Sequence, residues 1–235
     1  MRAVPFALAL ALLCAAPAQQ AAATELRDPW AADYDVWLGG FRLAALRVEM
    51  APAPEGWRAR AEVTTKGLAA FFIPAQGAAE AAPGWFRARG DFDGLLQTVE
   101  MRHAAGAAPE IRAEPALRQR AYDAPPQTLR GALDPLTAAV AALSPRPAAQ
   151  ACGQRVEVFD SRRRFDLALG PGVREGGMLR CEGAYVRVAG FKDKHMRLPD
   201  SAFTLWWRVR DGVAEFEKAV APTPLGHAVA KRRAE

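Results

Sequence analysis

The residues with the greatest capacity for chemistry in this chain are its three histidines, and their spacing argues against a metal centre. His103, His195 and His227 lie far apart, and none has an E-x-x-H or C-x-x-H neighbour. A zinc site needs at least three side chains that converge on one point. The sequence therefore predicts no metal site.

Two further motifs approach functional patterns without completing them. Asp91-Phe92-Asp93-Gly94 begins like a calcium loop, but the later oxygen ligands and the closing Glu are missing. Ser161 lacks a G-x-S-x-G elbow and precedes a run of three arginines, so it is a poor candidate nucleophile. We therefore expect no enzymatic activity and no cofactor.

Basic side chains cluster at two expected turns. Arg162 and Arg163, with Arg164 after them, flank a turn and are interpreted as a solvated hairpin tip or as contacts for an anion. Lys192 and Lys194 follow Gly190-Phe191 and indicate a loop rim that could form the mouth of a cavity. Both pairs are candidate ligand or anion contacts.

Trp206 and Trp207 are the aromatic candidates for ligand contact. They fall on an expected strand, so their indoles point to opposite faces of the sheet. One indole is predicted to lie in the core. The other needs a second cover, which solvent, a helix or a ligand could supply.

Cys152 and Cys181 are predicted to form a disulfide. The chain has three cysteines, and Cys14 lies within a segment that we expect to be removed. An even number of cysteines in an exported chain favours a bridge. The loop that it closes is worth about 3 kcal/mol in the chain-entropy model. The competing interpretation is two unpaired cysteines in the core.

Residues 1–23 have the pattern of a cleavable secretory signal peptide. Arg2 precedes an apolar run over 4–16 that is too short to span a bilayer, and Ala21-Ala22-Ala23 satisfies the small-residue rule for cleavage. Acylation at Cys14 is disfavoured because Leu13 stands where a small residue is required. We therefore expect cleavage near Ala23, a periplasmic location and no transmembrane segment in the mature chain.

Length and charge are those of one folded domain. The chain has 235 residues and a net charge of +5. Arg2 is the one charged residue of the signal segment, which leaves 30 basic and 26 acidic residues, or +4. This mild balance permits contact with an anionic surface and gives no reason to expect nucleic-acid binding. We divide the chain into the signal peptide, a polar leader over 24–32 and a single domain over 33–231.

Apolar and polar residues alternate over many short segments. Residues 57–65 place Trp57, Ala59, Ala61 and Val63 on one face, and this period of two is typical of a half-buried antiparallel strand. Gly39-Gly40 and Asp211-Gly212 are hairpin signals, whereas Gly170-Pro171-Gly172 is interpreted as a turn. Further strands are expected over 33–38, 41–50, 85–91, 95–102, 110–114, 154–159, 163–169, 178–189, 203–210 and 213–220, with a short one after Pro224.

One helix is predicted, over residues 135–143. Asp134 is a good N-cap, Pro135 suits the first helical position, and Ser144-Pro145 ends the run. The apolar stretch over 68–73 is either a helical turn or a buried corner. The fold class is therefore all-β and mainly antiparallel. It is a strongly curved sheet or an open β-barrel with one short helix packed across it.

Several turn and strand signatures together resemble a family of exported bacterial proteins known as domain of unknown function 3108 (DUF3108). The resemblance spans most of the mature chain and departs from the family at Gln97-Thr98. It implies a periplasmic, mostly β protein of no established activity and assigns no catalytic residue. The signatures are Tyr34-x-Val36 leading to Gly39-Gly40, Leu133-Asp134-Pro135-Leu136, Val158-Phe159-Asp160-x-Arg162-Arg163 before Phe165-Asp166-Leu167, Cys181-x-Gly183-x-Tyr185 with Ala189-Gly190-Phe191, and Thr223-Pro224-Leu225-Gly226.

Two functions are favoured from the sequence, ahead of a third, an enzyme with a dispersed site. The first is a cell-envelope protein whose concave sheet binds an apolar or lipid-like ligand beneath the helix. The second is a structural module that binds another envelope protein through a sheet edge or the basic rim. An apolar cavity of about 300 Å³ or more would favour the first.

Overall fold

A computed structural model describes residues 28–67, 70, 75–92 and 95–234, so the predicted signal peptide and most of the 68–73 run lie outside it. The described chain forms one antiparallel sheet of fourteen strands, in the order β7-β6-β5-β4-β3-β2-β1-β14-β13-β12-β11-β10-β9, with β8 paired to β13. The strands are β1 Trp30–Leu38, β2 Phe41–Ala53, β3 Gly56–Thr65, β4 Ala75–Ala82, β5 Trp85–Phe92, β6 Leu95–Arg102, β7 Glu110–Glu114, β8 Arg146–Pro147, β9 Arg155–Phe159, β10 Arg164–Glu175, β11 Met178–Ala189, β12 Ser201–Arg210, β13 Val213–Thr223 and β14 Gly226–Arg232.

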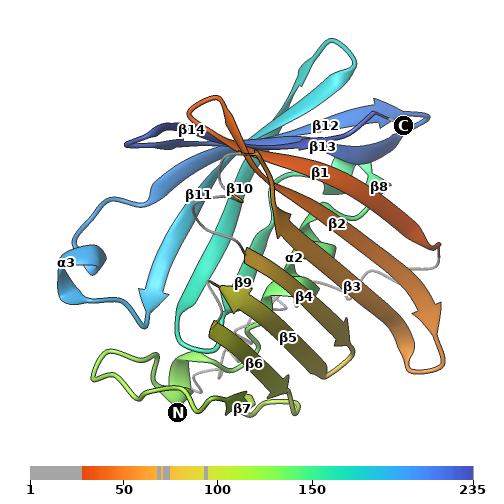
Figure 1. The fold of residues 1–235 in the computed structure, drawn as a ribbon. Coiled ribbons are helices and arrows are strands. Elements are labelled where there is room, and N and C mark those ends of the chain that lie inside the picture. Colours follow the sequence, from red (N-terminus) through yellow and green to blue (C-terminus); the bar gives the residue numbers. More distant parts are fainter. Residues whose placement is uncertain (1–27, 68–69, 71–74, 93–94, 235) are drawn as a thin grey trace, which may run out of the picture.

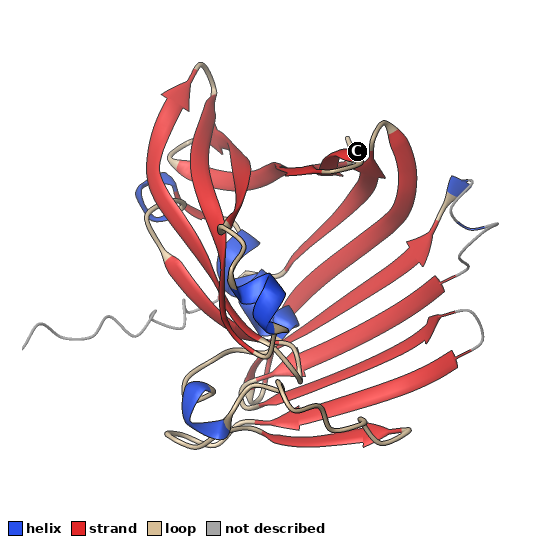
Figure 2. Ribbon diagram, turned by 90° about the vertical axis from the view of Figure 1, so that its left-hand side faces the viewer, coloured by secondary structure: helices blue, strands red, loops and turns tan. Residues whose placement is uncertain are grey.

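The sheet consists of two meanders joined by the first and last of these strands. Strands β1–β7 follow one another along one wall, and β9–β14 follow one another along the other. β1 joins the walls by pairing with β14, with Tyr34 opposite Arg232 and Leu38 opposite Ala228. The free ends, β7 and β9, do not pair with each other, so the curved sheet is an open barrel (Figures 1 and 2). The predicted fold class is confirmed.

A single helix of more than one turn lies between the walls in the described part of the chain. Helix α2 (Pro135–Leu143) is capped as predicted, because the Asp134 carboxylate accepts hydrogen bonds from the backbone N–H groups of Leu136 and Thr137. Figure 2 shows α2 crossing the concave side of the sheet. A four-residue helix, α3 (Asp193–Met196), and two 3₁₀ turns, η1 (Pro126–Thr128) and η2 (Ala148–Gln150), lie in connections.

The tight turns follow the predicted hairpin signals. Asp211 and Gly212 have φ values of 49° and 79°, the left-handed pair that a two-residue hairpin of this twist requires. Gly39 and Gly40 likewise have positive φ and join β1 to β2.

Four local features of the fold differ from what the sequence predicts. Gly170-Pro171-Gly172 is no turn, because β10 runs through it with a register shift between Leu169 and Gly172, as a bulge does. β4 is a strand that the sequence did not indicate, since five of its eight residues are alanine and one is glycine, and both types have little β propensity. β1 begins at Trp30, which pairs with Met50. The basic stretch after Phe191 contains α3 in addition to loop.

The main core lies between α2 and the concave face of both walls. Leu136 and Val140 of the helix pack there with Met50, Phe86 and Trp207 of the sheet. Ala138 and Ala142, on another side of α2, pack against Val156 and Val158 of β9. No helix in the described ranges has the length and apolar content that crossing a membrane requires.

Candidate binding cavity

A cavity of about 320 Å³ lies between α2 and the concave face of the sheet. The helix contributes Pro135, Ala138, Ala139, Ala142 and Leu143. Seven strands contribute the rest, namely Trp30, Tyr34, Leu46, Val48, Val156, Val158, Phe165, Leu167, Leu169, Phe203, Leu205, Phe216, Ala219 and Ala230. The cavity is thus built from both walls of the barrel and exists only when β1 and β14 are paired.

Small side chains provide the space in this cavity. Ala138, Ala139 and Ala142 face it from the helix, and Ala219 and Ala230 face it from β13 and β14. Larger side chains at these five positions would fill the same space. The alanine-rich sequence of α2, which reads PLTAAVAAL, therefore leaves the space between the helix and the sheet unfilled.

Among the lining residues, Tyr34 and Trp30 have a polar side-chain group, a phenol and an indole N–H. The side chain of Tyr34 is buried, and burial raises the pKa of the phenol to about 12. The phenol is therefore neutral at physiological pH and packs against Phe216, with ring centroids 5.5 Å apart. Because a charge buried without a partner is costly, these walls suit an uncharged, apolar group.

Buried polar groups fix both ends of α2 over the cavity. At the N-terminus, burial raises the pKa of the Asp134 carboxyl above its ordinary value, although hydrogen bonds from Thr137 and Leu136 oppose this shift. At the C-terminus, Arg146 donates to the carbonyl oxygens of Ala141 (Nη2–O 2.5 Å) and Ser144 (Nε–O 3.0 Å). These carbonyls would otherwise lack a partner inside the helix.

The guanidinium of Arg146 is itself almost fully buried. Burial lowers its pKa to about 10, so it remains charged at neutral pH. It lies 5.6 Å from the centroid of the Trp207 ring and also donates to the side-chain oxygen of Gln154 (3.2 Å). A cation at this position complements the negative end of the helix dipole.

The predicted disulfide between Cys152 and Cys181 is confirmed. The two Cα atoms are 5.6 Å apart and 29 residues apart in sequence. Cys152 follows η2, whereas Cys181 is fully buried on β11. The bridge therefore ties the connection that follows α2 to the wall that contributes Phe203 and Leu205.

The structure places the two tryptophans on opposite faces, as expected from their positions on β12. Trp207 is fully buried and meets Phe216 edge-on at 5.7 Å. Trp206 faces outward, and the Lys218 ammonium group lies 4.1 Å from its ring centroid. Lys218 therefore supplies the second cover that Trp206 needs, and neither indole lines the cavity.

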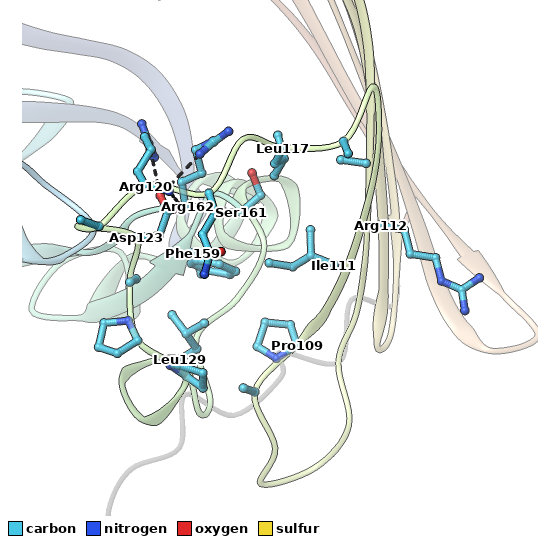
Figure 3. Close-up of a pocket in the computed structure, with 18 residues that line it drawn as sticks. Pro109, Ile111, Arg112, Leu117, Arg120, Asp123, Leu129, Phe159, Ser161 and Arg162 are labelled. Atoms are coloured by element: carbon cyan, nitrogen blue, oxygen red, sulfur yellow. Dashed lines mark hydrogen bonds and ion pairs between the residues drawn. The ribbon is translucent and has the colours of Figure 1, made fainter.

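A second, larger pocket of about 1070 Å³ lies where β7 faces the connection before α2 (Figure 3). We call it the seam pocket. Ile111, Leu129 and Phe159 point into it, whereas Arg112 points away. Arg162 reaches it and donates to the carbonyl oxygen of Arg118 (2.8 Å), and both Arg162 and Arg120 approach the Asp123 carboxylate, at 3.5 and 2.8 Å.

The other basic candidates lie apart from both cavities. Arg163 pairs with Asp160 (2.8 Å). Lys192 directly precedes α3 and Lys194 lies within it, and both are exposed. Arg164 is not the solvated residue expected at a hairpin tip. It is buried against Asp166 and also pairs with Glu157, since it begins β10 inside the sheet.

Comparisons with known proteins support the fold alone. No family model matches the chain, so membership of the DUF3108 family stays a prediction. No curated protein matches either. Among solved structures, the chain is similar to a crystal structure from Brucella abortus that is described as a beta-barrel-like protein of domain of unknown function DUF1849. That likeness has a TM-score of 0.50 and 14% identity, and it covers 87% of this chain and 95% of that chain.

The sequence did not identify the residues that line the cavity as a binding site. Their signal was present as the inward positions of the alternating strands, such as Phe165, Leu167 and Leu169 of β10. A pattern of this kind cannot separate side chains that fill a core from side chains that surround a space. In the described ranges, no group of three or more potential metal ligands comes together.

Proposed function

We propose that this protein is an exported cell-envelope protein that binds an apolar, acyl-chain-like ligand in the cavity beneath α2. The observation that carries the proposal is a cavity of about 320 Å³ whose walls are almost wholly apolar. Small-molecule sites range from about 300 to 1,000 Å³, so this cavity is large enough for a small ligand or for one chain of a larger one.

The chemistry of the walls supports an apolar class of ligand. Each buried methylene group contributes about 0.8 kcal/mol, so a chain of about ten carbons gains about 8 kcal/mol before the entropic cost of ordering it. No charged side chain lines the cavity. A carboxylate or phosphate on the ligand would therefore remain at the cavity mouth, where water can reach it.

The proposed location rests on the signal-peptide pattern of residues 1–23 and on the disulfide. Bridges such as Cys152–Cys181 persist in oxidising compartments, of which the bacterial periplasm is one. Membership of the DUF3108 family, which rests on the motifs quoted above, belongs to the same proposal.

Native mass spectrometry of protein purified from the periplasm tests this function. The wild type should carry a lipid-sized adduct that organic extraction removes. Ala139→Phe and Ala219→Phe, which place large rings in the cavity, should lose at least nine-tenths of the adduct. Ala113→Phe, in the seam pocket, is the matched control and should keep it.

Three results would count against binding in the cavity. The wild type could carry no adduct and take up no fatty acid added in excess. The adduct could persist in the Ala139→Phe and Ala219→Phe variants. The Ala113→Phe control could lose it to the same extent, which would place the ligand elsewhere. Circular dichroism and thermal unfolding establish that each variant is folded.

A specific observation also favours the second function, a protein-interaction module. The outer edge of β7 has no strand partner in the described sheet and forms part of the seam pocket. The outer edge of β9, in contrast, is covered, because Leu133 exchanges backbone hydrogen bonds with Glu157 and Phe159 at 2.8 Å. A photo-crosslinking residue at position 113 should capture an extended partner segment if β7 accepts an added strand.

A further inference from the structure

We propose that one end of the barrel, formed by the β1–β2 and β13–β14 turns, docks on an anionic lipid bilayer. This surface goes beyond the cavity and does not depend on what the cavity holds. We call it the turn end of the barrel and define it by residues 38–43, 64–67 and 223–229. Figure 1 shows both turns on one side of the molecule, with α3 on the same side.

The first observation is the exposure of two large apolar side chains. Leu225 is 74% exposed and Phe41 is 65% exposed, the highest values among the described large hydrophobic residues. Both stand in or beside tight turns, where nothing in the fold requires an apolar side chain. Large apolar groups on projecting turns are suited to insertion into the boundary between lipid headgroups and acyl chains.

The two turns are in direct contact, so the two side chains form one surface. The backbone N–H of Gly39 donates to the carbonyl oxygen of His227 (3.1 Å). Gly39 also has a φ of 55°, and a Cβ added there would lie 2.5 Å from the carbonyl oxygen of Leu225. Glycine is therefore required at position 39 for the turns to approach this closely.

The charges at the turn end have one sign. Its formally charged residues are Arg42 and Lys66, both cationic, and it contains no Asp or Glu. Lys66 lies next to the turns because its N–H donates to the carbonyl oxygen of Leu43 (2.7 Å). Arg42 is paired with Asp35, which lies farther along β1. Cations beside exposed apolar groups favour anionic lipid headgroups.

The loop around α3 extends the same surface. β12 begins at this end, because its Thr204 pairs with Val220 close to the end of β13. Before it, Met196 and Leu198 are 41% and 53% exposed. The loop is mildly basic, with Lys192, Lys194 and Arg197 against Asp193 and Asp200.

A second copy of the chain is a poorer partner for this surface. Two copies that met through the same turns would bring Arg42 and Lys66 of one towards the same cations of the other. The exposed apolar side chains, Phe41 and Leu225, lie in or beside two tight turns. A bilayer accepts separate insertions and supplies the opposite charge.

The concave face connects the turn end to the cavity through apolar residues. Val36 and Leu38 lie on the same side of β1 as Tyr34, and Ala228 lies on the same side of β14 as Ala230. Tyr34 and Ala230 line the cavity. A bilayer docked at this end would therefore face the apolar route into the barrel.

Vesicle co-sedimentation of the purified full-length mature protein tests the proposal. We expect binding to vesicles of phosphatidylethanolamine and phosphatidylglycerol, and weaker binding to phosphatidylcholine alone. Phe41→Ser with Leu225→Ser should lower the partition coefficient at least tenfold. Val173→Ser with Val213→Ser is the matched control, since these valines are 50% and 41% exposed at the opposite end, and it should leave binding within twofold.

A labelled cysteine distinguishes insertion from simple attraction. Because Cys152 and Cys181 are bridged, Leu225→Cys offers a single free thiol for an environment-sensitive fluorophore in the mature chain. Its emission should shift to the blue on anionic vesicles, whereas a label on Val173→Cys should not shift.

The proposal is overturned by any of four results. The wild type could fail to bind anionic vesicles. The Phe41→Ser, Leu225→Ser variant could bind them as the wild type does. The two valine substitutions could weaken binding equally. The turn substitutions could change the oligomeric state in light scattering and leave vesicle binding intact, which would assign the surface to a second copy. None of these results bears on the adduct seen by native mass spectrometry, so the two proposals fail separately.

Discussion

The cavity under α2 and the seam pocket differ in how their walls are held. Strand residues form most of the cavity wall, and the helix above it is fixed by buried groups, Asp134 and Arg146. The seam pocket is larger, but loop residues form most of its wall, and its ion pairs between Asp123 and two arginines are partly exposed. Size alone therefore does not identify the better site. The smaller cavity has fixed walls of one chemical character, as a preformed ligand site does.

If this comparison is right, substitutions around α2 should lower stability far more than substitutions at the seam. Arg146→Leu should have the largest effect. It leaves the buried carbonyl oxygen of Ser144 and the partly buried one of Ala141 without donors, at about 1–3 kcal/mol each, so we expect a loss of about 4 kcal/mol. Urea unfolding measures it. Arg146→Lys should recover only part, because an ammonium group lacks the planar fork. Wild-type stability in Arg146→Leu would show that burying the guanidinium costs as much as its hydrogen bonds contribute.

The disulfide should have the next largest effect. Replacing Cys152 and Cys181 with serine removes a bridge across 29 residues and should cost about 3 kcal/mol in the chain-entropy model. Thermal unfolding of the double variant should show a melting temperature lower by about 6–12 °C for a domain of this size. The single variant Cys152→Ser should behave like the double one. An unchanged melting temperature would mean that the strands hold this wall without the bridge.

Asp134 should have a smaller effect with a definite pH dependence. Asp134→Ala removes the N-cap and should cost about 1–2 kcal/mol. Because burial raises the carboxyl pKa in the folded state, that state binds the proton more tightly than the unfolded chain. Wild-type stability should therefore fall as pH rises from 3.8 through the raised pKa.

Asp134→Asn is the control for this pH dependence, because the amide oxygen still caps the helix and does not titrate. Burial lowers the pKa of His103, and the nearby Asp134 carboxylate opposes this shift, so the difference between the two stability curves reports on Asp134 together with its interaction with His103. Parallel curves for wild type and Asp134→Asn would contradict the raised pKa.

Arg162 at the seam should have the smallest effect. Its pair with Asp123 is partly exposed and 3.5 Å long, so Arg162→Ala should cost under about 1 kcal/mol. A loss as large as that of Arg146→Leu would remove the distinction between the two regions. It would also show that the connection between β7 and α2 is part of the cooperative fold.

Much of the fold was predictable because most strands have one face exposed to solvent and the other face buried. The alternation in β3 and the turn at Asp211-Gly212 are local signals, and the structure confirms both. β4 gave no such signal, since its sequence AQGAAEAA has no large apolar residue and its pairing is set by the strands beside it. The bulge at Gly170–Gly172 resembled a turn for a similar reason, because glycine and proline mark both features.

The site was less predictable than the fold. The sequence predicts Trp206 and Trp207 as candidate ligand contacts, yet Trp207 lies in the core and Trp206 is covered by Lys218. The cavity depends on Ala139 of the helix facing Ala219 and Ala230 of the last strands, residues about 80 to 90 positions away. Only the tertiary arrangement shows that small residues at these distant positions leave a shared space.

The pairing of β1 with β14 has a consequence for how the chain is made. Arg233 donates to Asp35 across 198 residues, so the first strand meets its second neighbour only after nearly all of the domain has been synthesised. Contacts this distant in sequence form slowly, because a very long loop must close first. A nascent chain that has not reached residue 226 lacks β14, so its two meanders cannot yet be joined into one sheet.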